Sequence, residues 1–283
     1  MDRDELLNKI IEVHNKCALI LRELFDKYED KNSLYFLTAM KLFNFITERM
    51  SAIVSLVNAN LLWDAEIICR SMAEASIKLL YISLNKNDDR NKRMKEYWED
   101  YEEINTIKQS EISKKTIDSL KDFDYSYSKM VFGPMILSEI DENNLRDKWP
   151  YRKRKELERK WSFSEMIKLI SSKDEYSSVI QSFLFNYMRS SHLIHADETG
   201  ILIIEERKSR SITEIDTVEN SHFCDILRKT FEFKYLCAYS IAIVFGNDCK
   251  KLKKLYSEVQ VVYDEMDKII NKVFEDPMYY KYK

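Results

Sequence analysis

The sequence predicts an all-α protein, a bundle of several helices with one short β-hairpin or strand near residues 200–213. Three observations predict this class. The 283 residues include only three glycines and three prolines, whereas turn-rich β architectures need many more. Apolar side chains recur at helical spacing over long stretches. Charged residues make up 33% and hydrophobic residues 45%, a balance typical of amphipathic helices around a core.

The predicted elements follow from periodicity, capping residues and helix breakers. We place helices, in order, at residues 4–28, about 33–59, 62–85, two within 88–132 with the second from about 113, one from about 163, one ending at Gly200, 217–245 and 248–275. Gly133-Pro134 and Trp149-Pro150 are the clearest breaks. The run from Ile201 to Glu205 is rich in β-branched residues and predicts the single strand.

Charge and cysteine content limit the classes of function and the compartment. The net charge of −3 gives no overall attraction to nucleic acid, so any RNA contact must use local patches. The five cysteines include no C-x-x-C pair and indicate buried thiols in a reducing compartment. The start of the chain lacks a signal-peptide pattern, and the most apolar run, Leu236–Phe245, is too short to span a bilayer. We therefore expect a cytoplasmic protein with no cofactor, in which residues 1–283 form a single helical domain.

Two charged residues lie within an apolar stripe of the predicted helix 62–85. The stripe follows a 4-3-4-3-4 spacing through Trp63, Ile67, Arg70, Glu74, Ile77 and Tyr81. A charge in such a stripe must be paired, because burial of an unpaired charge is costly. Arg70 and Glu74 therefore have two interpretations: a buried structural ion pair, or a pair that borders a pocket elsewhere in the bundle.

A cluster of titratable residues ends the helix before Gly200. Arg189 and His192 are three residues apart and share a face, with His195 three residues further on. Arg189 and His195 are about 240° apart, so they converge only if the helix loosens or a second element closes the gap. Each residue alone is more often structural, but clusters of this kind are enriched at functional sites. The two histidines, with Asp197 or Glu198 nearby, are a weak metal signal, and we favour a metal-free site.

A basic run with interleaved aromatic residues follows the second break. Its core is Arg152, Lys153, Arg154 and Lys155. Such a run is usually a solvated linker, and it is also what contact with an RNA backbone requires. We slightly favour the linker and keep the four residues as candidate RNA contacts.

Two segments resemble the HEPN superfamily, whose name abbreviates higher eukaryotes and prokaryotes nucleotide-binding. Arg189 is followed by Ser190 and, after five intervening residues, by His195, which resembles the Arg-x(4–6)-His motif of that superfamily. The segment 61–75, with Arg70-Ser-x-x-Glu74, is similar to a bacterial HEPN-like branch of unnamed function. The later motif of that branch reads roughly Tyr-Arg-x-x-Ser-x-x-x-His, whereas Tyr187 is displaced here by one position. The resemblance covers about residues 35–245, with helices 4–28 and 248–275 packed on this core.

The resemblance implies a helical bundle that dimerises and often acts as a metal-independent ribonuclease in toxin–antitoxin or phage-defence systems. His195 would then transfer protons, and His192 would act as a second acid or base or would orient the substrate. Arg189 would stabilise the phosphate, supported by Glu74, Arg70 and Ser190. RNA, a second copy of the chain, and an antitoxin or defence partner are the expected partners. Some members of the superfamily cleave nothing, so two alternatives stay open: a module that binds nucleotide, RNA or protein, and a purely structural interaction protein.

Overall fold

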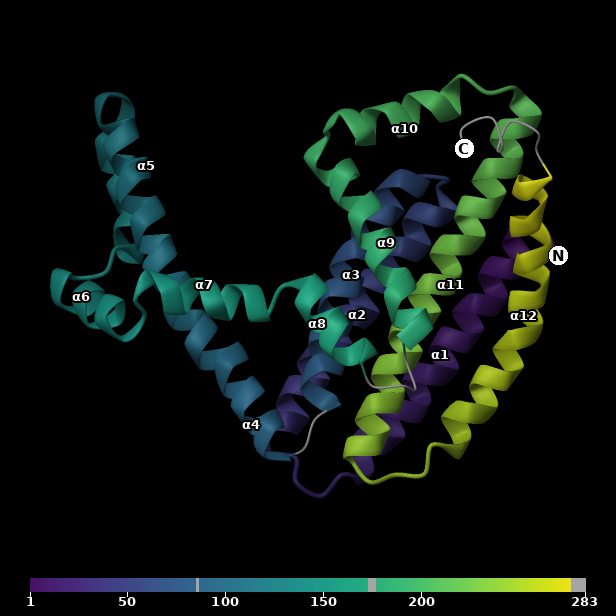
Figure 1. The fold of residues 1–283 in the computed structure, drawn as a ribbon, viewed down its shortest axis with the longest axis horizontal. Helices are drawn as coiled ribbons and strands as arrows, with labels where there is room; N and C mark the ends of the chain where they lie inside the picture. Colours follow the sequence, from purple (N-terminus) through teal and green to yellow (C-terminus); the bar gives the residue numbers. More distant parts are fainter. Residues whose placement is uncertain (85–86, 173–176, 276–283) are drawn as a thin grey trace. The chain divides into compact units, whose positions relative to one another are not determined.

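The computed structural model describes residues 1–84, 87–172 and 177–275, which contain helices and turns but no strand (Figure 1). The all-α class is confirmed for this part of the chain. The helices, in order, are α1 Arg3–Lys27, α2 Leu34–Asn58, α3 Leu62–Ser83, α4 Asn87–Lys95, the π-turn η1 Glu96–Asp100, α5 Tyr101–Phe132, the 3-10 turn η2 Gly133–Met135, α6 Glu139–Lys148, α7 Tyr151–Lys160, α8 Phe163–Ser171, α9 Ser177–His195, α10 Glu198–Lys208, α11 Ile212–Val244 and α12 Lys250–Phe274. The residues that lead into α9, 173–176, lie outside the described residues, as does the tail from residue 276.

The chain forms two compact units, where the sequence suggested a single domain. One unit comprises residues 1–84 and the chain from Met166 onward, and the other comprises residues 85–165. The second boundary falls inside α8, which begins at Phe163. A boundary within a continuous helix carries no Gly- or Pro-rich linker, which explains why composition did not reveal it.

Helix α11 is the centre of the first unit. It packs against α1, α2, α3, α10 and α12, and α3 in turn packs against α9 (Figure 1). Its start differs from the prediction. The cap is Ser211, whose Oγ accepts from the backbone N–H of Glu214 at 3.4 Å, while Glu214 Oε2 accepts from the backbone N–H of Ser211 at 2.8 Å. This reciprocal capping box starts α11 five residues before the predicted residue 217.

The strand predicted near residues 200–213 is wrong, because α10 begins at Glu198. Helix α9 ends at His195, and Ala196, with a φ of 45°, lies in the turn between α9 and α10. Asp197 then caps α10, with Oδ1 accepting from the backbone N–H of Gly200 at 3.0 Å. This cap starts a helix through residues whose β-branching had suggested a strand.

Gly200 is therefore not the end of α9 but a point of close contact between two helices. It is buried in the first turn of α10, and a Cβ atom there would lie 2.4 Å from the carbonyl oxygen of His192. Only glycine permits the start of α10 to approach the end of α9 this closely.

The second unit is built around α5. The sequence predicted a new helix from about residue 113, but α5 runs through that point and bends at Asp124, where φ is −151° and ψ is 73°. Asp124 Oδ1 accepts from the backbone N–H of Tyr127 at 3.0 Å, so the bend acts as an internal helix cap. The predicted break at Trp149-Pro150 is confirmed between α6 and α7.

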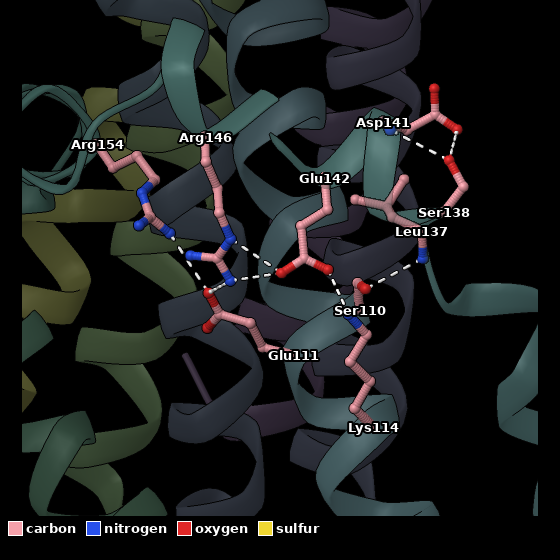
Figure 2. Close-up of polar contacts among 9 residues, drawn as sticks. All are labelled: Ser110, Glu111, Lys114, Leu137, Ser138, Asp141, Glu142, Arg146 and Arg154. Atoms are coloured by element: carbon pink, nitrogen blue, oxygen red, sulfur yellow. Dashed lines mark hydrogen bonds and ion pairs between the residues drawn. The ribbon is translucent and has the colours of Figure 1, made fainter. Parts of the chain in front are cut away.

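Ion pairs connect α6 to α5 within this unit (Figure 2). Arg146 Nη2 lies 2.7 Å from Glu142 Oε1 and 2.8 Å from Glu111 Oε1. Lys114 pairs with the other side of Glu142. Carboxylates that are shared in this way form a network that holds α5 and α6 together. An isolated ion pair on the surface would contribute little to stability.

Candidate functional site

The first unit contains a hydrogen-bonded polar network in which α3, α9 and α11 meet. Its centre is Glu66 on α3, whose side chain is 2% exposed. Arg189 on α9 donates from Nε to Oε1 at 3.3 Å and from Nη2 to Oε2 at 2.8 Å. Ser190 Oγ donates to Oε1 at 3.1 Å. His222 on α11 lies 2.8 Å from Oε2 through its Nε2. A buried carboxylate that makes four hydrogen bonds with three residues is fully satisfied and fixes the three helices to one another.

The contacts of His222 determine its tautomer. Its Nδ1 lies 3.1 Å from Nη1 of Arg207 on α10. Because a guanidinium only donates, Nδ1 accepts, and the ring proton is on Nε2, which donates to Glu66. The neutral imidazole thus connects Arg207 to Glu66 through two hydrogen bonds, one that it accepts at Nδ1 and one that it donates from Nε2.

The pKa shifts in the network agree with this arrangement. Burial acts to raise the pKa of Glu66, but the hydrogen bond from His222 and the charges of Lys229 and Arg189 outweigh it, so that pKa is lowered. Burial lowers the pKa of His222 in spite of Glu66. At neutral pH the network therefore holds an ionised Glu66 and an uncharged His222.

Arg189 has a second carboxylate partner. Asp225 Oδ2 on α11 lies 3.3 Å from Arg189 Nη2, and Lys229 one turn later also pairs with Asp225. The remaining nitrogen of Arg189, Nη1, has no hydrogen-bond partner among the described residues and is not sealed from solvent. Arg189 is thus anchored on one edge and free on the other.

Arg70 and Glu74 form a neighbouring cluster that contacts α9 through Tyr187. Arg70 Nη2 donates to the Tyr187 hydroxyl at 2.9 Å, and that hydroxyl donates to Glu74 Oε1 at 3.1 Å. Arg70 Nε also donates to Glu74 Oε1 at 3.4 Å. Their side chains are 15% and 38% exposed, so Glu74 is less buried than its position in the stripe suggested.

Glu74 was predicted to support the catalytic residues, but the carboxylate that orients Arg189 is Glu66, two turns earlier on α3. Among the described residues of α9, Glu74 contacts Tyr187, two residues before Arg189, and does not contact Arg189 itself. Which turn of α3 faces Arg189 depends on how α9 is rotated and shifted against α3, and a sequence pattern does not specify that.

His192 is held in place, whereas His195 is not. His192 Nδ1 lies 2.7 Å from Asp197 Oδ2, and the other oxygen of Asp197 caps α10. The ring is therefore oriented by a carboxylate that is itself fixed by backbone. His195 is exposed at the last position of α9, and no described residue hydrogen bonds to its ring. Helix α9 stays regular to His195, so no loosening brings that ring onto the face of Arg189.

The basic run lies on α7, so it is a helix and not a linker. Arg152 pairs with Glu156 at 3.0 Å, and Lys155 pairs with Glu158 at 2.8 Å. Arg154 lies 3.7 Å from Glu111 (Figure 2). Lys153 is exposed and has no ion pair within the described chain. Acidic neighbours offset most of this charge, which favours a solvated helix face over an RNA contact.

The described residues contain no group of three or more His, Cys, Asp or Glu side chains placed to hold a metal ion. None of the helices described combines the length and the apolar character that crossing a membrane requires. All five cysteines are free thiols.

Sequence reasoning missed Glu66, His222, Asp225 and Arg207. One signal was present for Glu66, since it lies among Ala65, Cys69 and Met72 on the buried side of α3. A carboxylate at such a position requires a partner, as was argued for Arg70. His222 and Asp225 lie within a largely apolar helix more than 30 residues after Arg189, and no local pattern links them to it.

Fold and site together define an all-α protein with a charged, hydrogen-bonded centre shared by three helices. The chain belongs to the family described as a family of unknown function (DUF5677), whose model matches residues 36–209. The match includes Glu66, Arg189, His192 and Arg207, and it ends before α11. Comparisons with curated proteins and with solved structures found no match.

Proposed function

We propose that this chain is a metal-independent endoribonuclease whose reacting groups are His192, His195 and Arg189 on α9. The observation that carries the proposal is the contact of 2.7 Å between His192 Nδ1 and Asp197 Oδ2, three residues from an arginine with a free Nη1. A histidine oriented by a carboxylate next to a fixed guanidinium is suited to phosphoryl chemistry. The resemblance of this segment to the HEPN motif supports the same activity.

The proposed reaction uses the 2′-hydroxyl of RNA as an internal nucleophile. Asp197 accepts a hydrogen bond from the Nδ1–H of His192, which leaves Nε2 unprotonated and able to remove the proton from the 2′-oxygen. That oxygen attacks phosphorus, and the bond to the 5′-oxygen breaks as His195 donates a proton to it. The products are a 2′,3′-cyclic phosphate and a free 5′-hydroxyl.

Arg189 stabilises the negative charge that develops on the phosphate. Glu66 holds its Nε and Nη2, and Ser190 supports Glu66, so Nη1 is presented without a change of conformation. Arg70 and Glu74 hold Tyr187 and thereby fix the preceding turn of α9.

We further propose that the active form is a homodimer in the cytoplasm, controlled by an antitoxin or defence partner. One chain offers two histidines and one available arginine nitrogen on α9, with His195 off the face of Arg189. A two-fold axis would bring two such sets of side chains to one RNA strand. Five free thiols fit a reducing compartment. Light scattering of the purified protein measures the oligomeric state.

A non-catalytic module that binds nucleotide, RNA or protein is the second candidate. The observation in its favour is that both Glu66 and Asp225 contact Arg189, which offsets the charge a transition state would need. In this case the chain binds its ligand and leaves it intact.

The test is cleavage of end-labelled single-stranded RNA by purified protein in excess EDTA, with the product ends mapped. We expect cyclic phosphate ends, no cleavage of DNA of the same sequence, and loss of activity in His192→Ala and His195→Ala. Activity that EDTA abolishes and a divalent ion restores would contradict the mechanism. RNA that is bound but not cut would favour the second candidate.

A further inference from the structure

Arg207 lies at the edge of the polar network, in the last turn of α10. Its Cζ is 3.9 Å from the centroid of the Trp63 ring, and its Nη1 donates to His222 Nδ1 at 3.1 Å. The Trp63 and His222 rings are themselves 4.8 Å apart. The guanidinium is thus fixed by a ring against one face and an acceptor at one corner, as expected of a preorganised donor.

Arg207 differs from the other cations of the network in having no counter-ion. Arg189 and Lys229 both pair with Asp225, and Arg189 also pairs with Glu66. No carboxylate of the described chain lies within ion-pair distance of Arg207. Burial lowers the pKa of Arg207 to about 10, with the charge of Arg189 acting in the same direction. The network therefore carries one cation more than its carboxylates balance, and that cation is Arg207.

Two carboxylates attract Arg207 from a greater distance, but both are engaged elsewhere. Glu219 Oε2 accepts from Asn60 Nδ2 at 3.3 Å, and Glu206 pairs with Arg210 at 2.7 Å. Both act on the charge of Arg207 without contacting it. The protein itself therefore leaves this charge unpaired.

The unoccupied part of Arg207 is the edge formed by Nε and Nη2. Neither atom has a hydrogen-bond partner among the described residues, and neither is sealed from solvent. Arg189 uses the same edge, Nε with Nη2, to bind both oxygens of Glu66. The two parallel N–H groups of this edge match a pair of oxygens on one acidic group.

We propose that the Nε/Nη2 edge of Arg207, backed by Trp63, binds the phosphoryl group of a nucleotide or of an RNA strand. Two oxygens accept from Nε and Nη2, and the negative charge balances the unpaired guanidinium. His222 transmits the contact to Glu66 and thus to Arg189. This site goes beyond the proposed cleavage, because binding at Arg207 requires no reacting histidine and is measured on protein that need not turn over.

The test is isothermal titration calorimetry of the full chain at constant ionic strength with two probes. Adenosine 5′-monophosphate presents a free phosphoryl group, and a short 2′-O-methyl RNA oligomer presents backbone phosphates that cannot be cleaved. We expect at least one probe to bind to wild type. The probe that depends on Arg207 identifies the source of the phosphate, a free nucleotide or a strand.

The decisive variant is Arg207→Gln, with Arg210→Gln as its matched control. Both remove one positive charge near the end of α10, but Arg210, which follows that helix, is already paired with Glu206. We expect Arg207→Gln to weaken binding about tenfold or more, since a charge-assisted bidentate contact is lost, and Arg210→Gln to change it less than about twofold. Equal weakening by both variants would show a general charge effect and overturn the site.

Two further measurements keep the test decisive if Arg207→Gln fails to fold. Arg207→Lys retains a charge near Trp63 but lacks the paired donors, and we expect it to weaken binding as well. Adenosine, which has no phosphate, should not bind in the same range. Wild-type affinity in Arg207→Lys, equal binding of adenosine, or no binding of either phosphate probe to wild type would each overturn the proposal.

Discussion

Glu66 and Arg189 form a two-point contact between α3 and α9, with Nε–Oε1 at 3.3 Å and Nη2–Oε2 at 2.8 Å. The carboxylate is buried, while the side chain of Arg189 is 26% exposed. The pair therefore connects the core to the surface of α9 on which His192 and His195 lie. Its strength determines how rigidly that surface is held.

Glu66→Gln should lower the free energy of unfolding by roughly 3–5 kcal/mol, because it removes one partner of a buried charge network. The control is Glu74→Gln, on the same helix, where a partly exposed carboxylate is lost and we expect about 1 kcal/mol or less. Urea denaturation at neutral pH measures both. Equal losses would mean that Glu66 is not the centre of the network.

Replacing Arg189 is a poor test of catalysis alone. Arg189→Ala leaves Glu66 buried with fewer partners, so it should destabilise the fold as well as remove the phosphate contact. Variants of His192 and His195, which lie outside the core, separate chemistry from folding.

Stability should fall as the pH is lowered from 7.5 to 5. Burial lowers the pKa values of His14 and His222 in the folded chain, whereas an unfolded histidine titrates near 6.5. Below that value the unfolded state binds more protons than the folded state, so stability rises with pH across this window. The carboxylate of Glu66, whose folded pKa is also lowered, contributes only below about 4.5.

Urea denaturation at several pH values tests this dependence. His14→Met and His222→Gln should each flatten the slope between pH 5 and 7.5. A wild-type stability that is constant over this range would contradict the lowered pKa values of His14 and His222 in the folded chain.

Lys234→Met should raise the free energy of unfolding by about 1–2 kcal/mol. Lys234 is 1% exposed on α11, burial lowers its pKa, and no carboxylate of the described chain pairs with it. An apolar side chain of similar length removes the cost of burying the amine. Lys229→Met, five residues earlier, should instead destabilise, because Lys229 is paired with Asp225. Thermal melts of the two variants should shift in opposite directions, and a shift in the same direction would refute the distinction.

Gly200→Ala should destabilise the junction of α9 and α10 by about 1–3 kcal/mol. The added methyl group would meet the backbone of His192 at 2.4 Å and force the two helices apart. Gly133→Ala is the control, since a Cβ there meets only the Cγ of Lys129 at 3.8 Å and should be tolerated. Equal melting temperatures for the two variants would contradict the close contact.

The fold class followed from the sequence because it depends on local features. Few glycines and prolines, long helical periods and the cap at Ser33, whose Oγ accepts from the N–H of Phe36 at 3.3 Å, all point to helices. The strand predicted after Gly200 failed because a cap from Asp197 and a close helix contact outweigh the preference of β-branched residues.

Only part of the site could be predicted from the sequence. Arg189, Ser190 and His192 were identified by their spacing on one helix. Their partners Glu66 and His222 come from helices far apart in the chain, and the pairing depends on helix rotation in the packed bundle. His192 is better oriented than His195 because Asp197, which the sequence placed before the end of the same helix at Gly200, instead caps the next helix.

The most direct test of the proposed ribonuclease is a DNA oligomer with a single ribonucleotide, incubated with the protein in EDTA. We expect wild type to cut only at that nucleotide, Asp197→Asn to cut more slowly because His192 loses its orienting carboxylate, and His192→Ala to be inactive. Replacing the 2′-hydroxyl by a 2′-O-methyl group should stop the reaction. Cleavage that persists with the blocked nucleotide, or in the His192→Ala protein, would contradict the mechanism.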